Sequence, residues 1–425
     1  MASKLFNKTT LKNGLRIITV PKEDSLAATV LVLVEAGSKY ETKNINGLSH
    51  FLEHMCFKGT ANRPTALKIS AELDGIGAEY NAFTSQEWTG YYAKAQAEHH
   101  DKILDVISDL YLNPIFDPKE IEKEKGVVIE ELNMYEDMPQ RKVQDLFLEL
   151  LYGDQPAGWD VGGKKEIIRT LNREDFLKYR QQHYVAKATI LVIAGAVNGK
   201  GLLAKIDKHF KNISSEEKHG KVKTKESQKK SEILVRHKES DQTHLVLGCR
   251  AFDAFDERRH ALEVLADILG GGMSSRLFQR VREQMGAAYY VNAGTDLFSD
   301  HGYLAVSAGV DHTKINAVIK AILEELAKIK ENSISEQELR RAKDHLTGKL
   351  ILGLETSDAL ALFYGGQEVL RRSIMSPEEL LKAIQSVSRK DIVNVANSVF
   401  QNSKLNLAII GPYKNKTEFE KILKF

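Results

Sequence analysis

An internal repeat constrains the fold of this chain more than any other feature of its sequence. Residues 80–93, YNAFTSQEWTGYYA, align with residues 291–304, VNAGTDLFSDHGYL. The alignment places Asn81-Ala82 on Asn292-Ala293 and Tyr92 on Tyr303. Self-similarity at a spacing of about 210 residues predicts that one structural unit has been duplicated within the chain.

Helix and strand signals follow the same order in both halves. Apolar residues at helical spacing occupy 101–112 and 315–329, and Asp117 and Ser335 then stand where helix N-caps are expected. Short β-branched segments predict strands at 15–20, 28–37, 188–195, 243–249, 303–309 and 405–411. Because the helices intervene irregularly, the sequence predicts two α+β domains, each a mostly antiparallel sheet with helices packed on it.

One segment differs in composition from the rest of the chain. Residues 214–232, SSEEKHGKVKTKESQKKSE, contain one aliphatic residue and many lysines, which predicts a solvated linker. A basic contact for nucleic acid is the alternative, but the interspersed glutamates and the lack of aromatic residues favour the linker. We therefore expect two homologous domains, at 1–213 and 233–425.

The bulk composition bounds the class of protein. The 60 basic and 58 acidic residues give a net charge of +2, so nothing suggests nucleic acid or a membrane as a partner. Only two cysteines, Cys56 and Cys249, are present, which excludes a disulfide scaffold. No apolar run approaches the ~18 residues of a membrane span, and the N-terminal residues lack the apolar core of a secretory signal. These features predict a cytoplasmic protein.

The stretch GLSHFLEHMCFKGT at 47–60 contains the residues that are best suited to bind a metal or to catalyse a reaction. If it is a helix, His50 and His54 are one turn apart and share a face, where two imidazoles can bind one zinc ion. Glu53 lies beside them and could take a proton from a water on that ion. The order H-x-x-E-H is the inverzincin signature. The structural alternative is an ordinary amphipathic helix with two surface histidines.

A catalytic zinc ion usually takes a third protein ligand. The carboxylate-rich stretch EKEKGVVIEEL at 122–132 is the best source, and 76 residues separate its Glu131 from His54. Glu124 lies seven residues before Glu131, two turns back on the same helical face, where it could support the site. The second half has no H-x-x-E-H, and the aligned positions hold Ala342 and Lys349 instead. The sequence therefore predicts one metal site, in the first half.

The chain resembles the pitrilysin family of inverzincin metallopeptidases, and its length and layout are similar to bacterial relatives of the mitochondrial processing peptidase beta subunit. The likeness rests on H-x-x-E-H with a glutamate about 75 residues later, and it extends to NAFTSQEWTGYYAKA and GGGMSSRLFQRVREQMGAAYYV in the two halves. The resemblance implies one Zn²⁺ per chain, held by His50, His54 and Glu131. It makes Glu53 the general base and Glu124 a supporting carboxylate needed for activity.

The resemblance also implies substrate contacts. Asn81 and Ala82 would lie on an edge strand that pairs with the backbone of an extended peptide. Arg282 and Tyr289 match an Arg/Tyr pair that contacts the substrate and the developing oxyanion. The structural alternatives are an internal strand, and a salt-bridged arginine with a core tyrosine. The glycine-rich loop at 270–278 lacks the G-K-[ST] ending of a phosphate loop, and the resemblance gives it a contact with substrate.

Long members of the resembled family join two such two-domain halves into a chamber. For a chain of this length the resemblance implies a homodimer, in which the second domain of one subunit closes over the zinc of the other. Expected substrates are peptides or unfolded segments, cleaved by a zinc endopeptidase. The alternatives are a non-catalytic partner subunit of a heteromeric processing peptidase and a metal-stabilised binding module. The intact set of His50, Glu53, His54 and Glu131 argues against the partner subunit.

Overall fold

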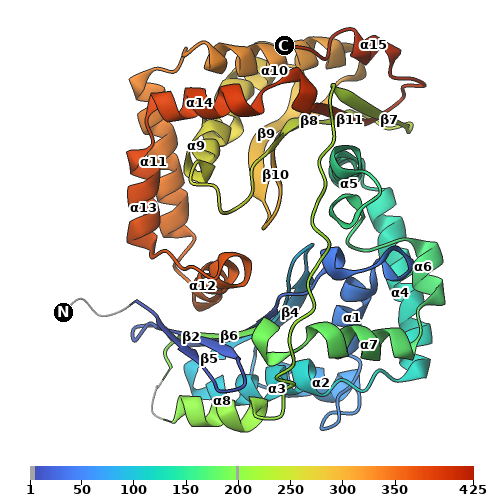
Figure 1. The fold of residues 1–425 in the computed structure, drawn as a ribbon, viewed down its shortest axis with the longest axis vertical. Helices are drawn as coiled ribbons and strands as arrows, with labels where there is room; N and C mark the ends of the chain where they lie inside the picture. The colour runs from blue at the N-terminus through green and yellow to red at the C-terminus, as the bar shows by residue number, and fades with distance from the viewer. Residues whose placement is uncertain (1–4, 198–200) are drawn as a thin grey trace. The chain divides into compact units, whose positions relative to one another are not determined.

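The computed structural model of this chain describes residues 5–197 and 201–425. The chain forms two compact units. Unit 1 contains the residues up to Leu132 together with Asp160–Val222 and Leu352–Ser376, and unit 2 contains Asn133–Trp159, Lys223–Ile351 and Pro377–Phe425. Each unit has one sheet with helices on it, which confirms the predicted α+β class (Figure 1).

Unit 1 is built on a six-stranded sheet in the order β1-β2-β6-β3-β5-β4. Its strands are β1 (Asn7–Thr10), β2 (Arg16–Pro21), β3 (Ala27–Val34), β4 (Glu79–Thr84), β5 (Thr89–Gln96) and β6 (Thr189–Gly195). Only β2 and β6 run parallel, and all other neighbours are antiparallel. The strands predicted at 15–20, 28–37 and 188–195 are confirmed as β2, β3 and β6.

Unit 2 has a five-stranded sheet in the order β7-β11-β8-β10-β9. Its strands are β7 (Glu232–His237), β8 (Thr243–Ala251), β9 (Ala288–Leu297), β10 (Gly302–Val310) and β11 (Leu405–Gly411). Again one pair is parallel, β7 with β11, and the others are antiparallel. The sheet repeats the order of unit 1 from β2 to β4, as the duplication predicts.

The sheets correct one detail of the repeat. Asn81 pairs with Tyr92 across β4 and β5, whereas Asn292, its counterpart on β9, pairs with Ser307. Tyr303 lies four residues earlier on β10. The expected match of Tyr92 with Tyr303 is therefore wrong. Both connecting loops have four residues, but β9 and β10 each run two residues further from the paired asparagine to the loop than β4 and β5 do.

The helices of unit 1 cover both faces of its sheet. They are α1 (Leu48–Cys56), α2 (Ala66–Asp74), α3 (His100–Leu112), α4 (Pro118–Glu136, to Leu132 in this unit), α6 (Lys165–Thr170), α7 (Arg173–His183), α8 (Leu202–Phe210) and α12 (Ser357–Arg371). Val30 and Val32 pack with α1 and α3 in one core, whereas Leu31 and Leu33 pack with α12 in another. A strand buried on both faces is expected to be apolar throughout, which explains the continuous run in β3.

Helix α12 belongs to the second half of the sequence but lies on the sheet of unit 1 (Figure 1). Its Ala361, Tyr364 and Val369 are buried against β2, β3 and β6. The approach is close, since a Cβ atom at Gly365 would come 2.7 Å from a methyl of Leu33. Glu368 of the same helix is fully buried and pairs with Lys8 and Arg16 of the sheet.

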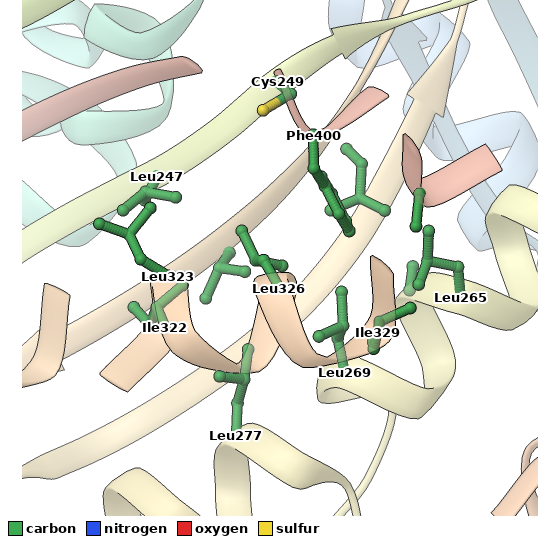
Figure 2. Close-up of a cluster of buried hydrophobic side chains, with 14 of the residues drawn as sticks. Leu247, Cys249, Leu265, Leu269, Leu277, Ile322, Leu323, Leu326, Ile329 and Phe400 are labelled. Carbon is green, nitrogen blue, oxygen red and sulfur yellow. The ribbon is translucent and has the colours of Figure 1, made fainter. Parts of the chain in front are cut away.

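Unit 2 shows the reciprocal arrangement. Helix α5 (Pro139–Tyr152), from the first half of the sequence, packs Val143, Leu146 and Phe147 on one face of the second sheet. On the other face lie the π-helical turn Phe278–Gln284 and the helices α9 (Arg259–Gly270), α10 (Ile315–Lys330), α11 (Glu336–Leu352, to Ile351 in this unit), α13 (Pro377–Ser386), α14 (Arg389–Val399) and α15 (Thr417–Glu420). Figure 2 shows this core, where side chains of α9 and α10 meet those of β8.

The compact units therefore differ from the continuous domains expected at 1–213 and 233–425. Each half of the sequence contributes one helix to the sheet of the other unit. The segment expected as a solvated linker, 214–232, is irregular in backbone, but it is held by hydrogen bonds. The amides of Thr224 and Lys225 donate to Asp300 and Gln155 at 2.9 and 2.8 Å. Within the described ranges, no helix combines the length and apolarity needed to cross a bilayer.

Candidate metal centre

The H-x-x-E-H stretch forms helix α1, as predicted. Its apolar side chains lie in the core of unit 1, and they are Leu48, Phe51, Leu52, Met55 and Cys56. This one-sided burial leaves His50, Glu53 and His54 on the opposite, partly exposed face of the helix. The core therefore fixes the direction in which the chemically active side chains point.

The N-terminus of α1 is held by a buried carboxylate that sequence reasoning missed. Glu41 accepts hydrogen bonds from the backbone N–H groups of Gly47 and Ser49 at 2.8 and 2.6 Å, and from the side chain of Asn46 at 3.1 Å. A negative charge at a helix N-terminus satisfies unpaired N–H groups and complements the helix dipole. Burial raises the pKa of Glu41 to about 7, against these hydrogen bonds. No spacing rule links Glu41 to the motif, since it lies before the helix, in a bend between two 3-10 turns.

Folding brings Glu131 of α4 to the two histidines. The Nε2 atoms of His50 and His54 are 3.3 Å apart, and Glu131 Oε2 lies 3.6 Å from the first and 3.4 Å from the second. A tetrahedral zinc ion with bonds of about 2.1 Å needs ligand atoms about 3.4 Å apart. The three side chains thus fit zinc in both donor type and spacing. In the described ranges they are the one such group of three.

Glu124 lies behind His54, as its position two turns before Glu131 suggests. The Nδ1 atom of His54 is 3.0 Å from Glu124 Oε1, and Lys58 Nζ is 2.6 Å from Oε2. A carboxylate at Nδ1 fixes the imidazole tautomer and directs Nε2 toward the metal position. Burial raises the pKa of Glu124, but His54 and Lys58 outweigh it, and the pKa falls below its ordinary value. Lys58 was not identified from the sequence.

Electrostatic coupling within the cluster is strong. Burial lowers the pKa of His54, but hydrogen bonds to Glu124 and Glu131 and the charge of Glu53 outweigh it, and the pKa rises to about 9. In the protein without metal, His54 is therefore protonated at neutral pH.

Glu53 lies beside the ligand cluster and makes its own contact. Its carboxylate accepts a hydrogen bond from the hydroxyl of Thr84, at the end of β4. The pKa of Glu53 lies above its ordinary value, mainly because the carboxyl group is buried. The negative charge of Glu131 raises it further, whereas the hydrogen bond from Thr84 and the charge of His54 lower it. A carboxyl group with a raised pKa is better matched to accepting and then returning a proton near neutral pH. Thr84 is a further residue that the sequence did not reveal.

The proposed substrate residues of unit 1 lie on an edge strand. Strand β4 ends the sheet, and it pairs only with β5 in the described part of the chain. Asn81 and Ala82 are at its middle, and the Asn81 side chain accepts the N–H of Ala82 at 2.9 Å. An edge strand offers backbone groups to which an extended peptide can add. The edge position favours the substrate role over the internal strand that was the alternative.

Arg282 and Tyr289 belong to unit 2 and are not part of the histidine cluster's unit. Arg282 lies over the ring of Phe278, 5.0 Å from its centroid, in the π-helical turn. Tyr289 is on β9 and 74% exposed, so it is not the core tyrosine that was the structural alternative. The aligned residues Ala342 and Lys349 lie on α11, the counterpart of α4, as the repeat predicts.

Known proteins match this chain over nearly its whole length. A family model described as Insulinase (Peptidase family M16) matches residues 16–164, and one described as Peptidase M16 inactive domain matches residues 170–346. A Bacillus subtilis relative described as an uncharacterised zinc protease is 35% identical over 411 residues, 97% of this chain and 99% of the relative. A Rickettsia felis relative with the same description is 36% identical over 410 residues, 96% and 98% of the two chains.

Solved structures share the same fold. The crystal structure of a protease from Helicobacter pylori superposes with a TM-score of 0.90 at 25% identity, over 96% of this chain and 99% of that one. A structure from Pseudomonas fluorescens, described as a peptidase M16 inactive domain, has a TM-score of 0.88 at 17% identity, over 96% and 98%. This second likeness concerns the fold alone.

Proposed function

Because the chain belongs to the pitrilysin family of zinc peptidases, M16, we propose that it is a zinc-dependent endopeptidase that cleaves peptides or unfolded segments. The observation that carries the proposal is the triangle of His50, His54 and Glu131, whose three edges match those of a zinc tetrahedron. The intact triangle favours this function over a non-catalytic partner subunit.

The residues around the triangle supply the remaining chemistry. When bound, zinc would polarise the scissile carbonyl and acidify the attacking water. Glu53 takes the proton from that water as its oxygen bonds to the carbonyl carbon. As the C–N bond breaks, Glu53 returns the proton to the leaving amine, so that one water is consumed for each bond cleaved. Glu124 keeps His54 in the tautomer whose Nε2 faces the metal.

The variant Glu53→Gln tests this function. We expect the purified variant to hold about one zinc per chain and to lose about 10²–10⁴-fold of its turnover on a quenched fluorescent peptide. Glu120→Gln, on the N-terminal turn of α4, serves as the matched control and should cleave normally. Wild-type turnover by Glu53→Gln with zinc bound would refute the role of Glu53. A zinc-loaded wild type that cleaves none of a broad set of peptides would refute the function.

The proposed assembly is a homodimer in which Arg282 and Tyr289 of one subunit complete the site of the other. Complementation tests it, because Glu53→Gln and Arg282→Ala subunits damage different parts of a shared site. After subunit exchange, half of the dimers are hybrids with one intact site of two, so about a quarter of wild-type activity should return. A monomer with full activity, or no recovery on mixing, would contradict the shared site.

A further inference from the structure

Unit 2 contains a cavity that takes no part in the metal chemistry proposed above, although one of its walls is the glycine-rich loop to which the resemblance gives a contact with substrate. Its volume is about 320 Å³, and it lies between α9, α11 and the glycine-rich loop that follows α9. By their order in the repeat, α9 and α11 are the counterparts of α1 and α4, the helices that hold the histidine cluster in unit 1. At the position of Glu124, Ala342 contributes only a methyl group to the cavity wall.

The cavity has unused hydrogen-bonding capacity. Ser275 lines it and is 6% exposed, yet its hydroxyl has no hydrogen-bond partner among the described residues. Buried hydroxyl groups without partners are rare and costly, which points to a partner that is bound from outside. Ser275 also immediately precedes the helical segment that begins at Arg276, where backbone N–H groups generally lack partners within the helix.

The charges around the cavity leave one cation without a counter-ion. The carboxylate of Asp267 pairs with Nδ1 of His345 at 2.8 Å, and Glu338 pairs with Arg276 through two contacts of 2.6 and 2.7 Å. The exposed Arg341 forms no ion pair or hydrogen bond with the described residues. Its charge is therefore available to an anion.

The rest of the wall is apolar and small. Ile268, Met273 and Ala342 line it, and Gly272 leaves room beside His345, since a Cβ atom there would come 3.6 Å from the imidazole. Met273 is 74% exposed on the loop, where it can contact a ligand side chain. A cavity at the small end of the range for ligand sites suits one or two residues of a peptide.

We propose that this cavity binds the free C-terminal carboxylate and last apolar side chain of a short peptide. The guanidinium of Arg341 and the hydroxyl of Ser275 donate to the carboxylate, and Ile268, Met273 and Ala342 surround the side chain. A planar guanidinium is the side chain best matched to a carboxylate. The site needs neither zinc nor Glu53, and so it stands apart from the proposed catalysis.

Titration of full-length protein with N-acetylated dipeptides tests the proposal. The Glu53→Gln variant, treated with chelator, prevents both cleavage and binding at the metal. Acetyl-Ala-Leu with a free carboxylate should bind, and its amidated form should bind at least tenfold more weakly. Arg341→Gln and Ser275→Ala should each weaken the acid at least tenfold. Arg340→Gln, an exposed arginine on the same helix that does not line the cavity, should change nothing.

The outcomes separate this site from the metal centre. Equal binding of acid and amide, or equal loss in Arg340→Gln and Arg341→Gln, would overturn the proposal. Binding that requires zinc would assign the peptide to the metal centre and overturn it as well. Binding that Ala342→Leu abolishes, while the variant keeps the wild-type unfolding midpoint, would support it. None of these results depends on whether the enzyme cleaves peptides.

Discussion

Loss of the buried carboxylate of Glu368 should release helix α12 from the sheet of unit 1. Glu368 is fully buried, and its two oxygens contact Lys8 Nζ at 2.7 Å and Arg16 Nη1 at 3.1 Å. The other Nη atom of Arg16 pairs with Glu35 at 2.5 Å. Replacement of Glu368 by Ala removes a negative charge from this network and leaves Arg16, itself 7% exposed, with one partner fewer.

The expected cost follows from that burial. Removal of one member of a buried ion pair costs about 3–5 kcal/mol, because the remaining charge stays desolvated without its partner. With a urea m-value of about 2 kcal/mol per molar, a loss of about 4 kcal/mol moves the midpoint of unit 1 down by about 2 M. Surface substitutions typically change stability by about 0.5 kcal/mol or less, which is a quarter of a molar on the same scale.

Tryptophan fluorescence can follow unit 1 by itself. The chain has two tryptophans, and in a Trp159→Phe background only Trp88 of unit 1 remains. Trp88 packs against Phe83 and lies beside Gly366 of α12, so its emission reports the contact that is being tested. Glu355→Ala, exposed and just before α12, is the matched control. A midpoint shift for Glu368→Ala as small as that of Glu355→Ala would refute the reasoning.

Three further predictions concern titratable groups. Glu124→Ala should weaken zinc about 10–100-fold in competition with a chelator, because His54 loses the acceptor at Nδ1; unchanged affinity would contradict that support. Since the pKa of His54 is about 9 without metal, zinc binding at pH 7.5 should release about one proton, measured by calorimetry in buffers of different ionisation enthalpy; a count near zero would disprove it. Burial lowers the pKa of His183 to about 4. Between pH 6.5 and 4 the unfolded chain therefore binds a proton at His183 that the folded protein does not, and the folded protein loses stability as the pH falls through this range. Between pH 7 and 5 the wild type should lose about 2 kcal/mol more than His183→Gln, and equal losses would count against a neutral His183.

The sequence predicted the parts of the fold that depend on neighbours in the chain. Asp117 and Ser335 cap the helices where the pattern placed them, since each accepts a backbone N–H of the first turn. The six predicted strands appear in the two sheets for the same local reason. The match of Tyr92 with Tyr303 failed because the residue that faces Asn292 depends on how far β9 and β10 extend before their loop, which residue similarity does not measure.

The residues of the candidate site also fall into two groups, those that spacing along a helix predicted and those that only packing brought to the site. His50 and His54 share a face because they are four apart on one helix, and Glu124 and Glu131 share one because they are seven apart. Glu41, Lys58 and Thr84 could not be found by such spacing. Each reaches the site through a contact that exists only after the surrounding segments have packed.

What the sequence determined by itself is therefore periodic and local: the duplicated unit, the helix that carries the histidines, and the carboxylates that share one face of α4. The tertiary structure alone decided which sheet each helix covers. Nothing in their own apolar faces assigns α5 to unit 2 or α12 to unit 1, because hydrophobic burial has no direction and either sheet offers an apolar surface. Close packing at Gly365 and the buried charge of Glu368 supply the specificity that places α12. The same packing left Ala342 on the wall of a cavity, whereas its counterpart Glu124 contacts His54 in the candidate metal centre.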